Sequence, residues 1–232
     1  QPKLLCVFGG DESGVRNALV GDSHAAQYFQ VVENIANSRG YTLASWTKSS
    51  CPFLAPLRYL QNPDLESCNS WQRNVMREVV DWHPRVVIIA NLTNDSVYSN
   101  TIAGSDIKFM SRFDAVLKTL NDQKILALVV EDFPMPTFDV VACGRIESIL
   151  ISSYKCEFPH ELSKLSQMQA KYLDSRNLKS LRPVNVLCET MCPGYRNRAN
   201  LYRDDSHLSL YGANTLRGMF VDVLVSLDSY FR

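Results

Sequence analysis

Two short, uninterrupted apolar runs constrain the fold of this chain more than any other feature. Val86–Ala90 reads VVIIA and Ile125–Val130 reads ILALVV, and segments with helical periodicity lie before and between them. Apolar runs of this length without polar alternation are typical of strands that are buried on both faces. Strands of that kind belong to parallel sheets with helices on both sides, so the sequence predicts an α/β fold.

The rest of the chain continues this alternation of strand and helix. Further short apolar strands are expected at Asn17–Val20, Tyr41–Trp46 and Val184–Leu187. Helices are expected at about His24–Ser38, Trp71–Trp82, Asp106–Leu120, Ile146–Ser153, Glu161–Ser175 and Ser209–Tyr230. Function in such sheets gathers at the carboxyl ends of the strands, and Ser23, Asn91 and Asn94 follow expected strands there.

Length and charge restrict the class of protein. The 232 residues suit one domain spanning 1–232, and no apolar run is long enough to cross a bilayer. Lys plus Arg and Asp plus Glu number 24 each, which gives no reason to expect a nucleic-acid partner. The chain begins with Gln and shows no leader, so we expect it to be a processed or excised part of a longer protein.

The seven cysteines point to an oxidising compartment. Six fall into close sequence pairs, Cys51/Cys68, Cys143/Cys156 and Cys188/Cys192, each in a segment expected to be a loop. This arrangement favours disulfides that staple loops, although the sequence alone does not fix their connectivity. The remaining alternative is a cytosolic protein with reduced, buried cysteines. Cys6 is left over, and its partner is expected outside the chain. No Cys-x-x-Cys pair occurs and the histidines are scattered, so no metal site is expected.

The stretch LVGDSHAAQYF, residues 19–29, places Ser23 between a strand and a helix. Ser23 is either a helix N-cap or a nucleophile at a strand tip, and a nucleophile needs a base and an acid that orients the base. The stretch YRDDSHLS, residues 202–209, supplies both, because Asp204 and His207 lie three residues apart before the last helix. His24 is interpreted as a capping or packing residue.

These two blocks together resemble the SGNH hydrolase superfamily. More narrowly, LVGDSHAAQYF, TKSSCPF (47–53) and DDSHLSLYGA (204–213) resemble the SGNH domains that follow membrane acyltransferase-3 domains in bacteria, with the actinobacterial type the most similar. The resemblance implies a flavodoxin-like three-layer α/β/α sandwich and no cofactor. It implies Ser23 as nucleophile and oxyanion-hole amide, His207 as base and Asp204 as its orienter. Residues 1–16 would then be a linker from a missing N-terminal membrane acyltransferase domain.

The two middle blocks of the superfamily are altered here. A glycine is usual after the second strand, where this chain has Ser49 or Ser50, and Gly-x-Asn-Asp is usual after the third, where it reads NLTND. A count without a gap puts Asn91 at the glycine and Thr93 at the asparagine, whereas one inserted residue puts Asn94 there. Ser50, Asn91 and Asn94 therefore all stay candidates for completing the oxyanion hole.

The resemblance implies an extracytoplasmic O-acyltransferase tethered to the cell membrane. It would pass an acyl group, expected to be acetyl, from its donor through Ser23 to a hydroxyl of a cell-envelope glycan or glycolipid. A trehalose mycolate is a plausible acceptor if the source is a mycolate-bearing actinobacterium. The altered middle blocks favour slow, specialised transfer over fast hydrolysis. The alternatives are a secreted carbohydrate acetylesterase and a binding module that presents the acceptor without catalysis.

Overall fold

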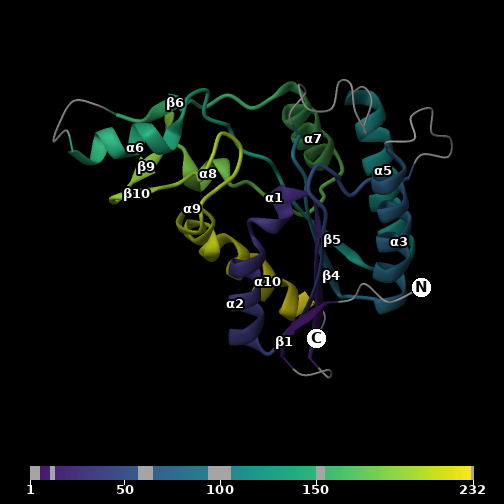
Figure 1. The fold of residues 1–232 in the computed structure, drawn as a ribbon. Coiled ribbons are helices and arrows are strands. Elements are labelled where there is room, and N and C mark those ends of the chain that lie inside the picture. The colour runs from purple at the N-terminus through teal and green to yellow at the C-terminus, as the bar shows by residue number, and fades with distance from the viewer. Residues whose placement is uncertain (1–5, 11–13, 57–64, 94–105, 150–154, 231–232) are drawn as a thin grey trace.

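A six-stranded sheet runs through the middle of the molecule (Figure 1). The computed structural model describes residues 6–10, 14–56, 65–93, 106–149 and 155–230. In spatial order the strands of this sheet are β1 (Val7–Gly9), β3 (Thr42–Thr47), β2 (Arg16–Gly21), β4 (Val86–Ala90), β5 (Leu126–Val130) and β7 (Ser180–Leu181). All neighbours are parallel except β1, which runs antiparallel to β3 at the edge.

The five parallel strands have the order of the flavodoxin-like fold, with β1 added at one edge. Counted from β2, the spatial order is 2-1-3-4-5. The chain leaves β2 toward β3 on one side and returns to β4 on the other, so the crevice for a ligand is expected at the carboxyl ends of β2 and β4. The register brings Gly21 of β2 beside Ala90 of β4 at that end.

Helices cover both faces of the sheet and form two separate cores. The first face carries α1 (Ser23–Ala26), α2 (Phe29–Arg39), α9 (Leu210–Thr215) and α10 (Arg217–Tyr230). The second carries α3 (Glu66–Trp82), α5 (Asp106–Asp122) and α7 (Lys164–Ser175). Leu19 of β2 points into the first core and Val20 into the second, which confirms the three-layer α/β/α sandwich. Among the described residues, no helix has the length and apolarity to cross a membrane.

A small lobe projects from the carboxyl end of the sheet (Figure 1). It contains α6 (Val140–Ile149), α8 (Val184–Leu187), β6 (Glu157–Pro159), β8 (Met191–Pro193), β9 (Tyr195–Arg196) and β10 (Ala199–Asn200). The disulfides Cys143–Cys156 and Cys188–Cys192 lie in this lobe, and Cys51–Cys68 joins the segment after β3 to α3. In the structure each cysteine of a close sequence pair is thus bonded to its neighbour, and three disulfides fit an oxidising compartment.

Several expected elements differ in the structure. Val184–Leu187 is a helical turn after Pro183 and not a strand, because a short apolar run does not by itself distinguish a buried strand from a buried helix. The last strand of the sheet is Ser180–Leu181 instead.

The expected helix 209–230 is split into α9 and α10 at Leu216, where the Thr215 hydroxyl donates to the carbonyl of Gly212. Residues 7–9, within the expected linker, pair with the sheet as β1.

Candidate active site

Ser23 lies at the carboxyl end of β2, where the chain turns sharply into α1. Gly21 permits this turn, because a Cβ at that position would lie 1.8 Å from the carbonyl oxygen of Ala90. Asp22 is the N-cap of α1, and its Oδ1 accepts a hydrogen bond from the amide of His24 at 2.8 Å. The capping role considered for Ser23 therefore belongs to Asp22, and the Ser23 hydroxyl is left for another partner.

That partner is His207, which is 184 residues further along the chain. The distance from Ser23 Oγ to His207 Nε2 is 2.8 Å. On the other side of the ring, His207 Nδ1 lies 2.9 Å and 3.0 Å from the two carboxylate oxygens of Asp204. The structure thus brings together the three side chains that the two sequence blocks predicted, in the order that a serine nucleophile, its base and an orienting acid require.

Asp204 is held as a carboxylate by the turn that contains His207. Burial by itself would raise the pKa of Asp204, but the backbone amides of Ser206 and His207 and the His207 ring together lower it to about 2. Those amides donate to Asp204 Oδ1 at 3.0 Å and 2.7 Å. Asp204 is therefore charged throughout the neutral range and favours the tautomer in which His207 Nδ1 carries a proton.

The expected oxyanion donors lie in different surroundings. Asn91 follows β4 directly and is 4% exposed, and its Oδ1 accepts from the amide of Phe53 at 2.8 Å. Its Nδ2 is buried and has no hydrogen-bond partner among the described residues. Ser50 is exposed and has a φ of 57°, the left-handed conformation that glycine adopts easily. Asn94 lies outside the described residues.

Thr93 stands at the asparagine position when the block is counted without a gap, and its hydroxyl already has hydrogen-bond partners. Its Oγ1 lies 2.6 Å from Ser166 Oγ and 3.3 Å from Asp132 Oδ2, and the side chain is fully buried. These contacts turn the hydroxyl toward α7 and the end of β5. If the count is made without a gap, the residue at the asparagine position therefore presents no free hydroxyl donor.

A buried His–Asp contact that the sequence did not reveal lies beside His207. His24 Nδ1 is 3.0 Å from Asp132 Oδ1, with both side chains 2% exposed. Burial lowers the pKa of His24, but the carboxylates of Asp132, Asp22 and Asp204 together outweigh it, so the net shift is upward. The His24 and His207 ring centroids are 5.1 Å apart. Asp132 comes two residues after β5, so its place at a strand end was the signal that could have found it.

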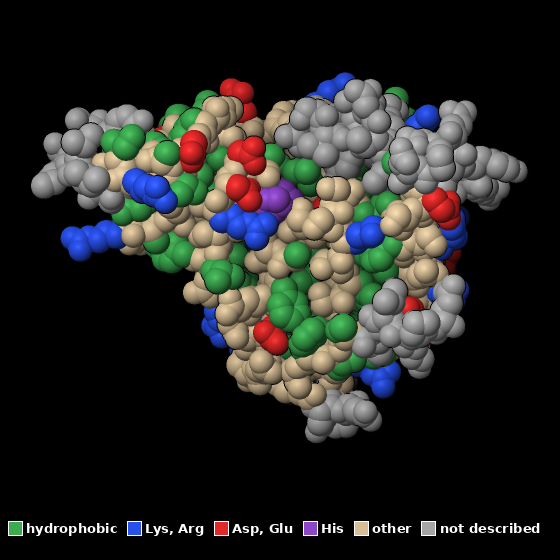
Figure 2. All heavy atoms as spheres, in the orientation of Figure 1, with side chains coloured by type: hydrophobic (Ala, Val, Ile, Leu, Met, Phe, Trp, Pro, Cys, Tyr) green, Lys and Arg blue, Asp and Glu red, His purple; other side chains and the backbone are tan. Residues whose placement is uncertain are grey.

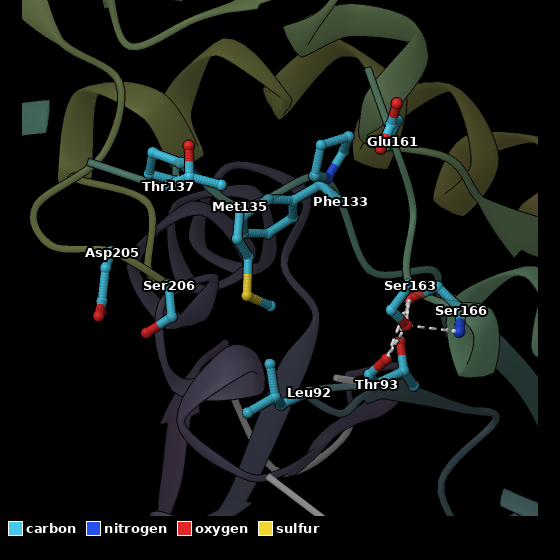
Figure 3. A pocket seen from close by; sticks show the side chains of 12 residues that line it. Leu92, Thr93, Phe133, Met135, Thr137, Glu161, Ser163, Ser166, Asp205 and Ser206 are labelled. Carbon is cyan, nitrogen blue, oxygen red and sulfur yellow. Dashed lines mark hydrogen bonds between the residues drawn. The ribbon is translucent and has the colours of Figure 1, made fainter. Parts of the chain in front are cut away.

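A cavity of about 450 Å³ is lined in part by Asp205 and Ser206, which directly precede His207 in the chain (Figure 3). Leu92, Phe133 and Met135 give it apolar walls, and Met135 points into its centre. Asp205 and Glu161 line different sides of it. In the view of Figure 2, a histidine is exposed at the centre of this face, with acidic and basic side chains around it. Apolar walls with polar groups at the sides are typical of sites for small organic ligands.

The described residues offer no grouping of three or more His, Cys, Asp or Glu side chains that could hold a metal ion.

Comparison with known proteins finds one matching family and several solved structures with a similar fold. The family model described as "SGNH domain (fused to AT3 domains)" matches residues 1–222. No curated protein matches the chain.

Among solved structures, the periplasmic domain of a lipopolysaccharide acetyltransferase from Salmonella ser. Paratyphi A has a TM-score of 0.70 and 15% identity, covering 93% of this chain and 85% of its own. A GDSL-like lipase from Bacteroides thetaiotaomicron has a TM-score of 0.57 and 14% identity; the match covers 92% of this chain and 89% of the lipase chain. An acetylxylan esterase from Geobacillus stearothermophilus has a TM-score of 0.52 and 13% identity; the match covers 93% of this chain and 94% of the esterase chain. At these identities the likeness concerns the fold.

Proposed function

The chain belongs to the SGNH domains that are fused to AT3 domains, and on that premise we propose that it transfers an acyl group through an ester on Ser23. The observation that carries the proposal is the hydrogen-bonded series from Asp204 through His207 to Ser23, with contacts of 2.9 Å and 2.8 Å. A serine hydroxyl is a weak nucleophile until a positioned base removes its proton, and this series supplies the base and its orienter.

In the first half of the reaction, His207 Nε2 takes the proton of Ser23 Oγ as that oxygen attacks the carbonyl carbon of the acyl donor. The negative charge that develops on the carbonyl oxygen would be stabilised by the Ser23 amide and by Asn91 Nδ2. The Ser23 amide is at the first position of α1 and has no intrahelical acceptor. Collapse of the intermediate expels the leaving group, which takes the proton from His207 and leaves an acyl ester on Ser23.

In the second half, His207 takes the proton of an acceptor hydroxyl while its oxygen attacks the ester. Collapse releases the new ester, and the proton returns to Ser23 Oγ. The cavity of Figure 3 is where this acceptor would lie. The carboxylates of Asp205 and Glu161 would accept hydrogen bonds from sugar hydroxyls and repel anionic groups, which favours a neutral glycan or glycolipid acceptor. Transfer prevails over hydrolysis when the bound acceptor excludes water.

The acyl donor is proposed to be supplied by a membrane acyltransferase domain of the AT3 type, because the family is described by that fusion. Acetyl is the acyl group proposed, by analogy with the printed description of the Salmonella domain as a lipopolysaccharide acetyltransferase. Three disulfides support placement outside the cytoplasm. The actinobacterial type and the trehalose mycolate acceptor stay predictions of the sequence.

A fluorophosphonate probe tests the covalent step, because an activated serine displaces its fluoride and keeps the phosphonyl group. We expect a single adduct, mapped to Ser23 by mass spectrometry, that disappears in Ser23→Ala and falls by at least about 10³-fold in His207→Ala. Ser38→Ala, a helical serine far from the site, is the matched control and should label like the parent. A parent protein that stays unlabelled at Ser23 refutes the proposal and favours an acceptor-binding module.

A second experiment separates transfer from hydrolysis. The protein is mixed with p-nitrophenyl acetate and a neutral sugar, and acetylated sugar and free acetate are both measured. Transfer predicts that acetylated sugar exceeds acetate and rises with sugar concentration. Acetate as the sole product identifies a carbohydrate acetylesterase instead.

A further inference from the structure

The segment 91–93, which carries the proposed oxyanion donor, is held by two buried carboxylates. Asp22 Oδ2 accepts from the amide of Leu92 at 2.9 Å, and Asp132 Oδ2 accepts from the amide of Thr93 at 2.7 Å. Both acids are buried. Consecutive amides of one loop are thus each bound by a carboxylate from a different strand end, one after β2 and one after β5.

The second oxygen of each carboxylate binds the same residue, His24. Asp22 Oδ1 accepts from the His24 amide at 2.8 Å, and Asp132 Oδ1 pairs with His24 Nδ1 at 3.0 Å. His24 is therefore tied to the segment 91–93 through its backbone by one acid and through its ring by the other. Hydrogen bonds to charged, buried acceptors are stronger and shorter than neutral ones, so this double connection restrains the loop tightly.

The carbonyl side of the loop is also occupied, by the start of α7. The hydroxyl of Ser163 donates to the carbonyl oxygen of Thr93, and Ser166 Oγ donates to it at 3.2 Å. The loop backbone is thus held from both sides, through the Leu92 and Thr93 amides on one and the Thr93 carbonyl on the other. Asn91 stands between this arrangement and the last residue of β4.

From these contacts we infer that His24 is a positioning residue for the oxyanion hole, acting on Asn91 through the two carboxylates. The inference rests on the proposed function, since it assigns His24 a task in the same acyl transfer. A positioning role for His24 accounts for what stabilises this loop, in which the usual Gly-x-Asn-Asp pattern is altered. Distance matters here, because an oxyanion donor acts at about 2.7–3.1 Å from the developing charge and loses its effect when displaced.

Two substitutions of His24 separate its Nδ1 contact from general packing. Asparagine places an amide donor near the position of Nδ1, whereas glutamine reaches toward Nε2, which has no hydrogen-bond partner among the described residues. We expect His24→Asn to keep the fluorophosphonate labelling rate of Ser23 within about threefold of the parent. We expect His24→Gln to lower it by about 10- to 100-fold. Equal rates for the two variants, with thermal unfolding showing both folded, overturn the inference.

A double-mutant cycle with Asn91→Ala provides a readout that a merely structural role would not move. If His24 acts through Asn91, the double variant His24→Gln/Asn91→Ala should label about as slowly as Asn91→Ala alone. If the fold losses in labelling rate of the two single variants multiply in the double variant, His24 acts independently of Asn91. That result overturns the inference and leaves the proposed function standing. If the glutamine variant does not fold, Asp132→Asn replaces it in the same cycle, since it removes the charge at nearly constant volume. A parent protein without labelling at Ser23 overturns both proposals.

Discussion

Replacing Asn91 by alanine tests the proposed oxyanion donor in depth, because the two ends of its amide have separate tasks. Oδ1 accepts from the buried amide of Phe53 at 2.8 Å, and Nδ2 has no partner among the described residues. Loss of an oxyanion donor costs about 3–4 kcal/mol of activation free energy, which slows the reaction by about 10²–10³-fold. Loss of the acceptor leaves the Phe53 amide unsatisfied, and the free energy of unfolding falls by about 1–3 kcal/mol.

The assay measures the second-order rate constant of fluorophosphonate labelling at Ser23, well below the unfolding temperature of every variant. Thr93→Val is the matched comparison. It removes a hydroxyl that contacts Asp132 and Ser166 but keeps the Thr93 backbone amide. We expect Thr93→Val to lose about 1 kcal/mol of stability and less than about threefold in rate. A larger rate loss in Thr93→Val than in Asn91→Ala would refute the assignment of the donor to Asn91.

Three further predictions concern the acid, the altered glycine position and the disulfide. Asp204→Asn should lower the labelling rate by about 10³–10⁴-fold. Because the pKa of Asp204 is lowered from 3.8 to about 2, its carboxylate stabilises the fold above pH 3.8 and this contribution is lost as the pH falls through about 2. Its half-exposed side chain limits the effect to about 1 kcal/mol or less, measurable by urea unfolding at both ends of that range. Ser50→Gly should raise the free energy of unfolding by about 0.5–1 kcal/mol, since glycine adopts a φ of 57° without strain; an unchanged or lower unfolding temperature would contradict this. Removing the Cys51–Cys68 disulfide with a double alanine variant should cost about 3 kcal/mol, and a loss below about 1 kcal/mol would show that the bridge constrains little of the unfolded chain.

The parallel sheet and the three side chains of the Asp204–His207–Ser23 series could be predicted because each leaves a local mark in the sequence. VVIIA and ILALVV are expected to be strands buried on both faces, and the structure buries all of Val86–Ala90 and the last three residues of β5, Leu128–Val130. A glycine and a capping acid before Ser23 mark a tight turn from strand to helix. Asp204 and His207 are close enough in sequence for one turn to hold them together.

The other half of the site depends on which strands are neighbours, and the sequence does not encode that locally. Asp132 meets His24 because β2 and β5 both pair with β4 and all three carboxyl ends open on one edge. The place of Asp132 two residues after β5 makes it a candidate, but nothing near it in the sequence indicates that it meets His24. The apolar segment Val184–Leu187 illustrates the same limit, because its composition suits a strand and a helical turn equally.

Contacts between the segment that carries Ser23 and the segment that carries His207 are a reason to run the labelling test on this chain by itself. Gln27, one turn beyond Ser23, accepts from the Leu208 amide at 2.7 Å and donates to the His24 carbonyl at 3.1 Å. Leu208 pairs with Tyr202 across the turn that holds Asp204 and His207. The segment carrying the base is thus attached directly to the segment carrying Ser23. Because the described contacts that attach His207 to Ser23 lie within this chain, we expect the isolated chain to keep the reactivity of Ser23, and the labelling test measures this directly.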